Sequence, residues 1–244
     1  MDVPYFHLIP LSPLDQVNLP PASFLLVQEA LVLVSTFGWT AAYVLYCRQA
    51  FLDRSYGVPL ITLVLNTAWE VVFGLIVPPS NDMVFVAGPW TILEAILIYA
   101  TIKHGAVEWK HTPLVANNLW WILPSSVVIS CGFYLAFIQS FEEFRNALIA
   151  SALINQLCTS VGAVLHLSKG NTRGHSLGIW VTRTNGTFWT VVAHYWQMIH
   201  YPQDHPLNLL PVIQYGMWVF LACDFILYPI TYFHVSRLEK KKLT

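Results

Sequence analysis

Long apolar runs recur along the chain and restrict it to folds that use a lipid bilayer as solvent. We predict seven such runs, at residues 22–46, 58–77, 83–102, 119–138, 147–167, 177–199 and 208–233. Each is long enough to cross a hydrocarbon core of about 30 Å, because a helix rises about 1.5 Å per residue. Only 10% of the residues are charged, against about 25% in soluble domains. The sequence therefore predicts an all-α, polytopic membrane protein with seven transmembrane helices.

Turn signals separate these runs and divide the chain. Pro, Gly and Asn gather at residues 78–82, 168–174 and 201–206, where they favour turns. We predict a proline-rich N-terminal segment (1–21), a seven-helix membrane domain (22–236) and a basic cytosolic tail (237–244). The N-terminal segment has neither the basic region nor the uninterrupted apolar region of a cleavable signal peptide. The first spanning helix is therefore expected to act as the insertion signal.

The lysines and arginines predict the orientation of the chain. With seven spans, ten of them fall on one side of the membrane, and only Arg145 falls on the other. Cytosolic loops carry most of the Lys and Arg of a membrane protein. The N-terminus is therefore predicted to be lumenal and the C-terminus cytosolic. The cations are scattered rather than gathered on one face, so no nucleic-acid partner is expected.

Two acidic residues lie inside the predicted spans, Glu70 in the second and Asp224 in the seventh. A carboxylate at bilayer depth costs at least about 2.5 kcal/mol, and it is usually retained for a function. Asn66 and Glu70 are four residues apart and share a helix face, which has to point into the bundle because lipid offers it no partner. Both acids lie near the midplane and are predicted to form a buried pair. The alternative is that each is a structural carboxyl between helices.

Such a pair suits proton donation. Desolvation favours the neutral form of a carboxyl, and two neighbouring carboxyls reinforce the effect. A neutral carboxylic acid in an apolar cavity can act as a general acid. The sequence does not determine whether Glu70 or Asp224 would donate the proton, because two coupled carboxyl groups titrate as a pair and the proton need not belong to either one.

Further polar residues within the spans are candidates for the same site. Glu94 could join the cavity or pair with a cation, and Arg183 could extend to the interface or neutralise an acid. His194 is predicted to be interfacial. A polar group in the fifth span is predicted to make contacts between helices: Asn155, Gln156 and Thr159. The glycosylation sequence at 185–187 lies within a span, where the transferase cannot reach it, so we reject it.

Three tryptophans lie deeper in the predicted spans than the interfacial ones. Trp69, Trp180 and Trp218 could hold a cation against their ring faces, with about 0.5–2 kcal/mol each. Such rings would suit a carbocation intermediate, although ordinary helix packing also explains each of them. We predict that all three contribute to a substrate site.

The absence of several known motifs excludes classes of enzyme reaction for this chain. The chain has no Asp-rich DDxxD or DxDD run, so diphosphate ionisation with Mg²⁺ is not expected. It has no HExxH, GxSxG or Walker sequence. The seventh span contains no mid-membrane lysine for a retinal Schiff base. The four cysteines include no CxxC pair. No metal or cofactor is predicted.

A series of motifs resembles the small seven-span terpene cyclases of fungal meroterpenoid and indole-diterpene pathways. The motifs are YGVPL and NTAWE (56–70), EWKHTPLVAN (108–117), GNTRGHS (170–176), WVTRTNG (180–186) and the isolated Asp224. The resemblance implies that Glu70 and Asp224 are the essential acids and that no metal takes part. It implies that the terminal epoxide of a prenylated polyketide-derived aromatic, with farnesyl as the favoured prenyl group, is protonated and that the resulting cation cyclises. The enzyme would lie in the endoplasmic reticulum membrane.

The resemblance also implies partners and leaves alternatives. A lipophilic epoxidised substrate would reach the site from membrane lipid, supplied by a prenyltransferase and an epoxidase of the pathway. An indole-diterpene cyclase of the same family is an alternative. A small proton-coupled transporter that uses the two acids as a relay is another. A structural or receptor-like protein with both acids between helices is the third. The sequence does not specify the prenyl length, the head group, the product or the oligomeric state.

Overall fold

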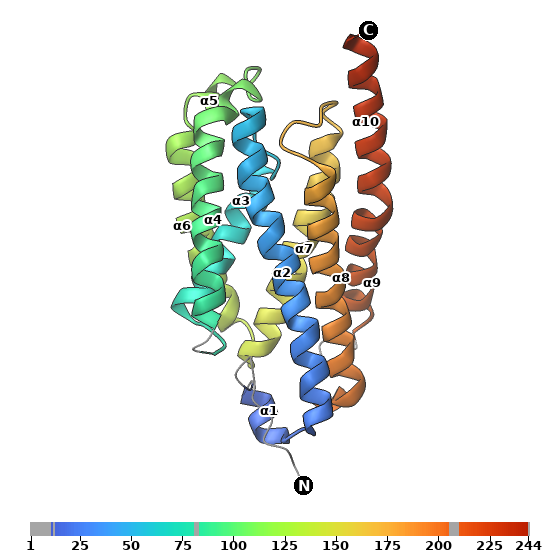
Figure 1. Cartoon of the computed structure of the whole chain (residues 1–244). Coiled ribbons are helices and arrows are strands. Elements are labelled where there is room, and N and C mark those ends of the chain that lie inside the picture. The colour runs from blue at the N-terminus through green and yellow to red at the C-terminus, as the bar shows by residue number, and fades with distance from the viewer. Residues whose placement is uncertain (1–10, 12, 81–82, 205–209, 244) are drawn as a thin grey trace.

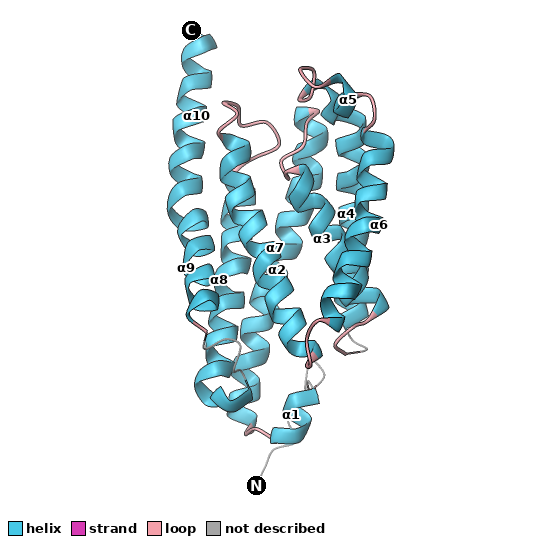
Figure 2. Cartoon of the chain, turned by 180° about the vertical axis from the view of Figure 1, so that it is seen from behind, coloured by secondary structure: helices cyan, strands magenta, loops and turns pink. Residues whose placement is uncertain are grey.

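The computed structural model describes the whole chain except residues 1–10, 12, 81–82, 205–209 and 244. All regular structure in the described part is helical, and Figure 2 shows no strand there. The elements are α1 (Pro13–Asn18), α2 (Ala22–Asp53), α3 (Leu60–Val71), η1 (Val72–Ile76), α4 (Met83–His104), η2 (Gly105–Val107), α5 (Pro113–Ala116), α6 (Leu119–Gln139), α7 (Phe144–Leu167), α8 (Leu177–His200), η3 (Pro202–Asp204), α9 (Pro211–Ala222), η5 (Cys223–Leu227) and α10 (Tyr228–Leu243). The all-α prediction is confirmed.

Five helices are long and apolar enough to cross a membrane: Ala22–Asp53, Met83–Val107, Leu119–Gln139, Phe144–Leu167 and Pro211–Lys242. The second predicted span is a shorter apolar helix, Leu60–Ile76. The sixth, α8, has sufficient length, but polar residues such as Arg183 and Asn185 lower its hydropathy. Seven crossings and the orientation of the termini therefore stay predictions.

The predicted boundaries differ from the helices at several points. The first predicted span, α2, continues to Asp53, seven residues past the predicted end. Helix α10 continues to Leu243, so most of the predicted basic tail extends a helix of the membrane domain. The predicted start of the seventh span, residue 208, lies outside the described residues, as do parts of the predicted turns at 78–82 and 201–206 and of the segment 1–21.

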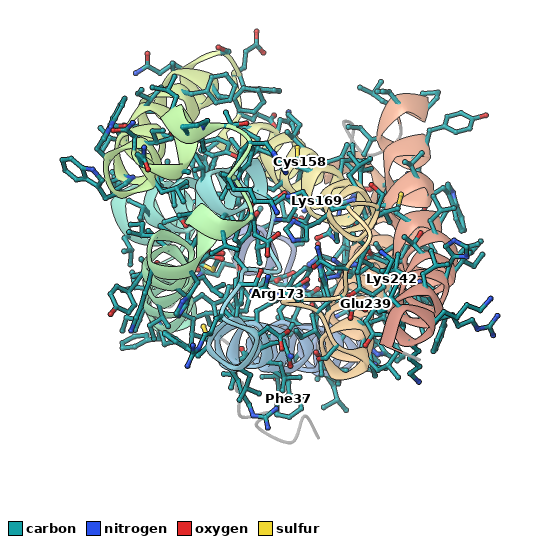
Figure 3. All side chains as sticks on the ribbon, turned by 90° about the horizontal axis from the view of Figure 1, so that it is seen from above. Phe37, Cys158, Lys169, Arg173, Glu239 and Lys242 are labelled. Atoms are coloured by element: carbon teal, nitrogen blue, oxygen red, sulfur yellow. The ribbon has the colours of Figure 1, made fainter. Side chains whose placement is uncertain are left out.

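The long helices lie side by side, with the described ends of the chain at opposite ends of the bundle (Figure 1). Helices α2, α4, α3, α7, α9 and α8 contact one another in that order and form a ring. Helix α6 packs outside the ring against α3, α4 and α7. Large apolar side chains point outward, as Phe37 does from α2 at 75% exposure (Figure 3). Such a surface requires an apolar surrounding.

Small residues let α2 and α8 approach closely, and this is the most extensive helix contact. A Cβ atom on Gly186 would lie 2.9 Å from the backbone nitrogen of Trp39, and one on Gly38 would lie 2.7 Å from the nitrogen of Gly186. The Ser35 hydroxyl donates a hydrogen bond of 3.0 Å to the carbonyl of Gly186. Packing and polar contacts of this kind hold helices together in lipid.

The loop between α7 and α8 closes the C-terminal end of the bundle. Arg173 donates hydrogen bonds of 2.9 Å to the carbonyls of both Asp53 and Arg54, and it pairs with Glu108 at 3.2 Å. Gly174 has a φ of 79°, and a Cβ atom there would meet the backbone of Gly57 at 2.5 Å. Figure 3 looks onto this end, where Lys169 and Arg173 lie over the bundle.

Burial changes the ionisation of a side chain at this end. It raises the pKa of Tyr56 to about 12. The Tyr56 hydroxyl accepts a hydrogen bond of 2.6 Å from the indole of Trp109. The Lys169 ammonium lies 5.5 Å from the centre of the Tyr56 ring and 5.6 Å from that of Trp109. This layer joins the YGVPL, EWKHTPLVAN and GNTRGHS motifs, so they have a structural role.

The α2–α8 contact predicts unequal effects of two glycine substitutions. Gly186→Ala places a methyl group against the backbone of α2, and overpacking of this kind costs about 1–3 kcal/mol. Gly132→Ala, in α6, meets no atom within 4 Å and gains helix propensity of up to about 1 kcal/mol. Thermal unfolding in detergent is expected to show a lower midpoint for Gly186→Ala and an unchanged or higher one for Gly132→Ala. Equal midpoints would contradict the close packing of α2 on α8.

Candidate active site

A cavity of about 320 Å³ lies within the helix ring. All six ring helices line it, and α6 does not. Ile149 near the start of α7, His194 near the end of α8 and Ile213 near the start of α9 belong to its wall. The cavity therefore lies mainly in the half of the bundle that is nearer the N-terminus. Its wall is largely apolar and aromatic, with a few polar groups.

Glu70 lines this cavity. It stands near the end of α3, just before the π-helical segment η1, and only 4% of it is exposed. Its Oε2 atom has no hydrogen-bond partner among the described residues. Asn66, one turn earlier, and the neighbouring Trp69 also line the cavity, and the Trp69 indole donates a 3.0 Å hydrogen bond to Ser151. The predicted inward face of this helix is confirmed for Asn66 and Glu70.

Glu94 is the carboxyl that interacts with Glu70. It lies on α4, fully buried, and its Oε2 atom accepts a 2.8 Å hydrogen bond from Thr67. It lines a second cavity of about 20 Å³, which shares Asn66 and Tyr43 with the first. The phenol of Tyr43 faces the same carboxyl. Of the alternatives for Glu94, the structure favours a place beside the cavity over pairing with a cation.

Asp224 has a different neighbour from the one predicted. Its Oδ1 atom lies 2.6 Å from the Nη2 atom of Arg183, and neither side chain is exposed. Arg183 also stacks over the ring of Tyr228 at 4.9 Å and donates to the hydroxyl of Tyr46 at 3.5 Å. Arg183 therefore neutralises an acid and does not extend to the interface. Asp224 does not line the cavity, so the structure does not bring it to the cavity wall with Glu70.

The π-helical segment η5 carries Asp224, and its cause lies in the sequence. Pro229 has no N–H group, so the carbonyl four residues earlier loses its α-helical partner and the hydrogen-bond pattern changes locally. The segment covers Cys223–Leu227. Both predicted acids therefore lie in or beside π-helical turns, which are frequent at functional sites.

Three predicted contacts lie away from the cavity. The Trp180 indole donates a 2.8 Å hydrogen bond to the backbone carbonyl of Asp224 and packs with Leu167 and Tyr228. Trp218, on α9, is 62% exposed and faces outward. Arg183 is buried behind the cavity wall. Of the three predicted tryptophans, only Trp69 lines the cavity.

The sequence interpretation missed most of the aromatic and polar wall. Ser35, Trp39 and Tyr43 recur at intervals of four residues and face the cavity from α2. The same interval predicted the face of Asn66 and Glu70, so this signal was available. The predicted helix-contact residues Asn155, Gln156 and Thr159 line the cavity, and so does His194, which had been predicted to be interfacial. Trp90, Thr187, Thr190 and Phe220 complete the missed aromatic and polar positions.

The described residues contain no group of three or more His, Cys, Asp or Glu side chains placed to hold a metal ion. The chemistry that the cavity offers is that of a carboxyl group, an imidazole, several amides and hydroxyls, and aromatic rings. A carboxyl with an unpartnered oxygen can donate or accept a proton. Aromatic faces can stabilise a positive charge that forms beside them.

Comparison with known proteins identifies the family. The family model of Pyr4-like transmembrane terpene cyclases matches residues 14–238. The Pyr4-family terpene cyclase mfmH of Annulohypoxylon moriforme is 39% identical over 236 residues, which cover 96% of this chain and 97% of that protein. The terpene cyclase macJ of Penicillium terrestre is 32% identical over 220 residues, 88% of this chain and 84% of that protein.

A third relative is the terpene cyclase pyr4 of Aspergillus fumigatus, 33% identical over 175 residues, 71% of this chain and 72% of that protein. No solved structure matches the chain. The family match includes every residue that lines the cavity. The chain therefore belongs to the Pyr4-like transmembrane terpene cyclases.

Proposed function

We propose that the chain cyclises an epoxidised prenyl chain attached to an aromatic head group and that Glu70 is the general acid. The observation that carries the proposal is Glu70, a buried residue that lines an apolar cavity and whose carboxyl has one oxygen without a hydrogen-bond partner among the described residues. A buried carboxyl of this kind favours its neutral form and can donate a proton. Glu94 beside it supports the neutral form further, because two neighbouring carboxyls resist a double negative charge.

The proposed reaction is an isomerisation. The Glu70 proton passes to the epoxide oxygen, and the bond from that oxygen to the tertiary carbon breaks, leaving a hydroxyl group and a carbocation. Successive alkenes attack the cation and form the rings. The last cation loses a proton, or a hydroxyl of the head group captures it and loses its own proton. One proton enters and one leaves, so substrate and product have the same mass.

The cavity suits this sequence of steps. Its volume of about 320 Å³ lies within the range of about 300–1,000 Å³ typical of small-molecule sites. Trp39, Tyr43, Trp69 and Trp90 give it aromatic walls against which a cation can be stabilised. An apolar wall also keeps water from capturing the cation. The substrate we propose is a farnesylated, polyketide-derived aromatic, which would partition into the membrane.

We further propose the topology predicted from the sequence, with seven crossings, a lumenal N-terminus and a cytosolic C-terminus in the endoplasmic reticulum. The segment around α5, the loop between α7 and α8 and the basic end of α10 lie at the same end of the bundle, at the top of Figure 1, which supports this orientation. A prenyltransferase and an epoxidase would supply the substrate, because the reaction consumes a prenylated epoxide.

Replacing Glu70 tests the proposed acid. Glu70→Gln keeps the size of the side chain and removes its acidic proton, so turnover is expected to fall by about 10²–10⁴-fold. Glu142→Gln is the matched control, because Glu142 is exposed in the turn between α6 and α7. Microsomes with equal protein levels would receive an epoxyfarnesylated aromatic ester, and products of unchanged mass would be separated by chromatography. Full activity of Glu70→Gln would refute the assignment of Glu70.

Chelation tests the proposed absence of a metal. The acid in this mechanism is a side chain, and the described residues form no metal-binding group. Turnover by purified protein is therefore expected to survive millimolar EDTA, within about twofold of the untreated sample. A loss of activity that Mg²⁺ restores would refute the metal-free mechanism.

A further inference from the structure

Asn155, on α7, is held at the cavity wall by a residue from outside the helix ring. Its Oδ1 atom accepts a hydrogen bond of 2.7 Å from the hydroxyl of Tyr134. Tyr134 belongs to α6, which packs against the ring and does not line the cavity. Tyr134 is 1% exposed, and Asn155 is 8% exposed and lines the cavity. This hydrogen bond therefore joins α6 to the cavity wall.

The surroundings of Tyr134 determine which end of the Asn155 amide faces it. The phenol packs in an apolar cluster with Ala68, Val72 and Phe73. Among the described residues its hydroxyl makes one hydrogen bond, the bond to Asn155. A buried hydroxyl places its hydrogen on an acceptor, and the acceptor of an amide group is its oxygen. The Asn155 oxygen is therefore fixed toward Tyr134, and the NH2 group is directed away from it.

The NH2 group of Asn155 is available to a ligand. Apart from the helix backbone and the bond to Tyr134, the hydrogen bond of Asn155 to the described residues is made by its backbone carbonyl, which accepts from the Thr159 hydroxyl at 2.8 Å. The amide nitrogen has no acceptor there, and it is not one of the enclosed atoms that lack a partner. Because Asn155 is 8% exposed and lines the cavity, this accessible nitrogen lies at the cavity surface.

Two hydrogen bonds set the register between α3 and α7. The Thr62 hydroxyl donates to the backbone carbonyl of Cys158 at 3.0 Å. The Trp69 indole donates to the Ser151 hydroxyl at 3.0 Å. As the residue number increases along α3, that of the facing residue on α7 decreases. The two helices are therefore antiparallel neighbours, and the positions between these two contacts face one another in reverse order.

This register places Asn155 close to Glu70. Asn155 lies between the two contacts on α7, across from Asn66 on α3, and all three residues line the cavity. Glu70 follows Asn66 by four residues on the same helix face, which is about 6 Å along the axis. One oxygen atom that accepts hydrogen bonds of about 3 Å from two groups spans such a distance. A substrate oxygen can therefore contact Asn155 and Glu70 together.

We propose that the NH2 group of Asn155 binds the epoxide oxygen beside Glu70 and that Tyr134 is the positioning residue that orients the amide. The inference rests on the proposed function and specifies a substrate contact for it. An epoxide oxygen has two lone pairs, so it accepts a hydrogen bond from Asn155 with one and the Glu70 proton with the other. The bond from this oxygen to the tertiary carbon then breaks, and the new hydroxyl stays bound to Asn155. The amide also stabilises the negative charge that builds on the oxygen as that bond lengthens.

Two ligands that differ only in the epoxide oxygen test the contact. They are the epoxyfarnesylated aromatic ester and the farnesylated ester without the epoxide. Their dissociation constants would be measured by tryptophan fluorescence in protein that carries Glu70→Gln, so that the epoxide is not consumed. Asn155→Leu removes the donor and keeps a similar side-chain shape, and Tyr134→Phe removes only the orienting hydroxyl. Tyr215→Phe is the matched control, because Tyr215 is 73% exposed and lies outside the cavity.

We expect Asn155→Leu to raise the Kd of the epoxide by about 3–10-fold, as when one hydrogen bond is lost. The Kd of the farnesylated ester is expected to stay within about twofold, because that ligand has no oxygen for Asn155 to bind. Tyr134→Phe is expected to show the same selective loss by a smaller factor, and Tyr215→Phe to show none. A structural defect would weaken both ligands alike, so equal losses for the two ligands would overturn the inference.

A double variant controls for the stability of the fold. Asn155→Leu leaves the buried Tyr134 hydroxyl without its acceptor, which is destabilising, whereas Tyr134→Phe with Asn155→Leu removes both polar groups. The double variant is expected to lose the same affinity for the epoxide as Asn155→Leu alone, because Tyr134 acts only through the amide. Additive losses in the double variant, or an unchanged epoxide affinity in Tyr134→Phe, would overturn the positioning role of Tyr134.

Turnover separates this inference from the proposed function. With Glu70 restored, Asn155→Leu is expected to lower kcat by about 10-fold as well, because the epoxide oxygen is no longer held in place for the proton. If the wild type converted no epoxide of any prenyl length, the proposed function would fail and this inference with it. Conversion by the wild type, together with an epoxide affinity that Asn155→Leu leaves unchanged, would overturn only the inference.

Discussion

A guanidinium enclosed in an apolar helix bundle has to be neutralised, and the arrangement around the cavity depends on that requirement. Arg183 on α8 meets Asp224 on η5, which ties the last helix to the helix that packs most closely on α2. Gly38 and Gly186 allow that close packing. The same helices carry much of the cavity wall. A buried ion pair contributes little net stability by itself, but breaking it is costly, so it specifies which helices meet.

Much of the fold could be predicted from the sequence because spanning helices follow from hydropathy and length. The inward face of Asn66 and Glu70 was also predictable, since polar side chains on a lipid-embedded helix need partners inside the bundle. The partner of Asp224 could not be predicted from the sequence. The position of a residue along a spanning helix gives the depth of that residue in the membrane. It does not show which helix is the neighbour or toward which side of the helix the side chain points. Arg183 and Asp224 are 41 residues apart in the chain.

The direction of the tryptophan side chains was equally hard to predict from the sequence. Trp218 and Asp224 are six residues apart, which is about 600° of helix rotation, so their side chains diverge by about 120°. The π-helical segment η5 begins between them and changes the rotation further. Trp218 consequently faces outward at 62% exposure. Trp39 and Tyr43 line the cavity instead. They are four residues apart in α2, but this helix is apolar on all its faces, so the repeat does not stand out in the sequence.

The loop between α7 and α8 covers one end of the helix bundle. Arg173 ties that loop to the end of α2, and the Arg183–Asp224 layer lies below the loop. Ala152 and Thr190, both on the cavity wall in the opposite half, are exposed. In the described residues the cavity therefore lies in one half of the bundle, and the loop contacts hold the helix ends together in the other half. A substrate bound in this cavity would lie closer to the N-terminal ends of α2, α7 and α9 than to the loop between α7 and α8.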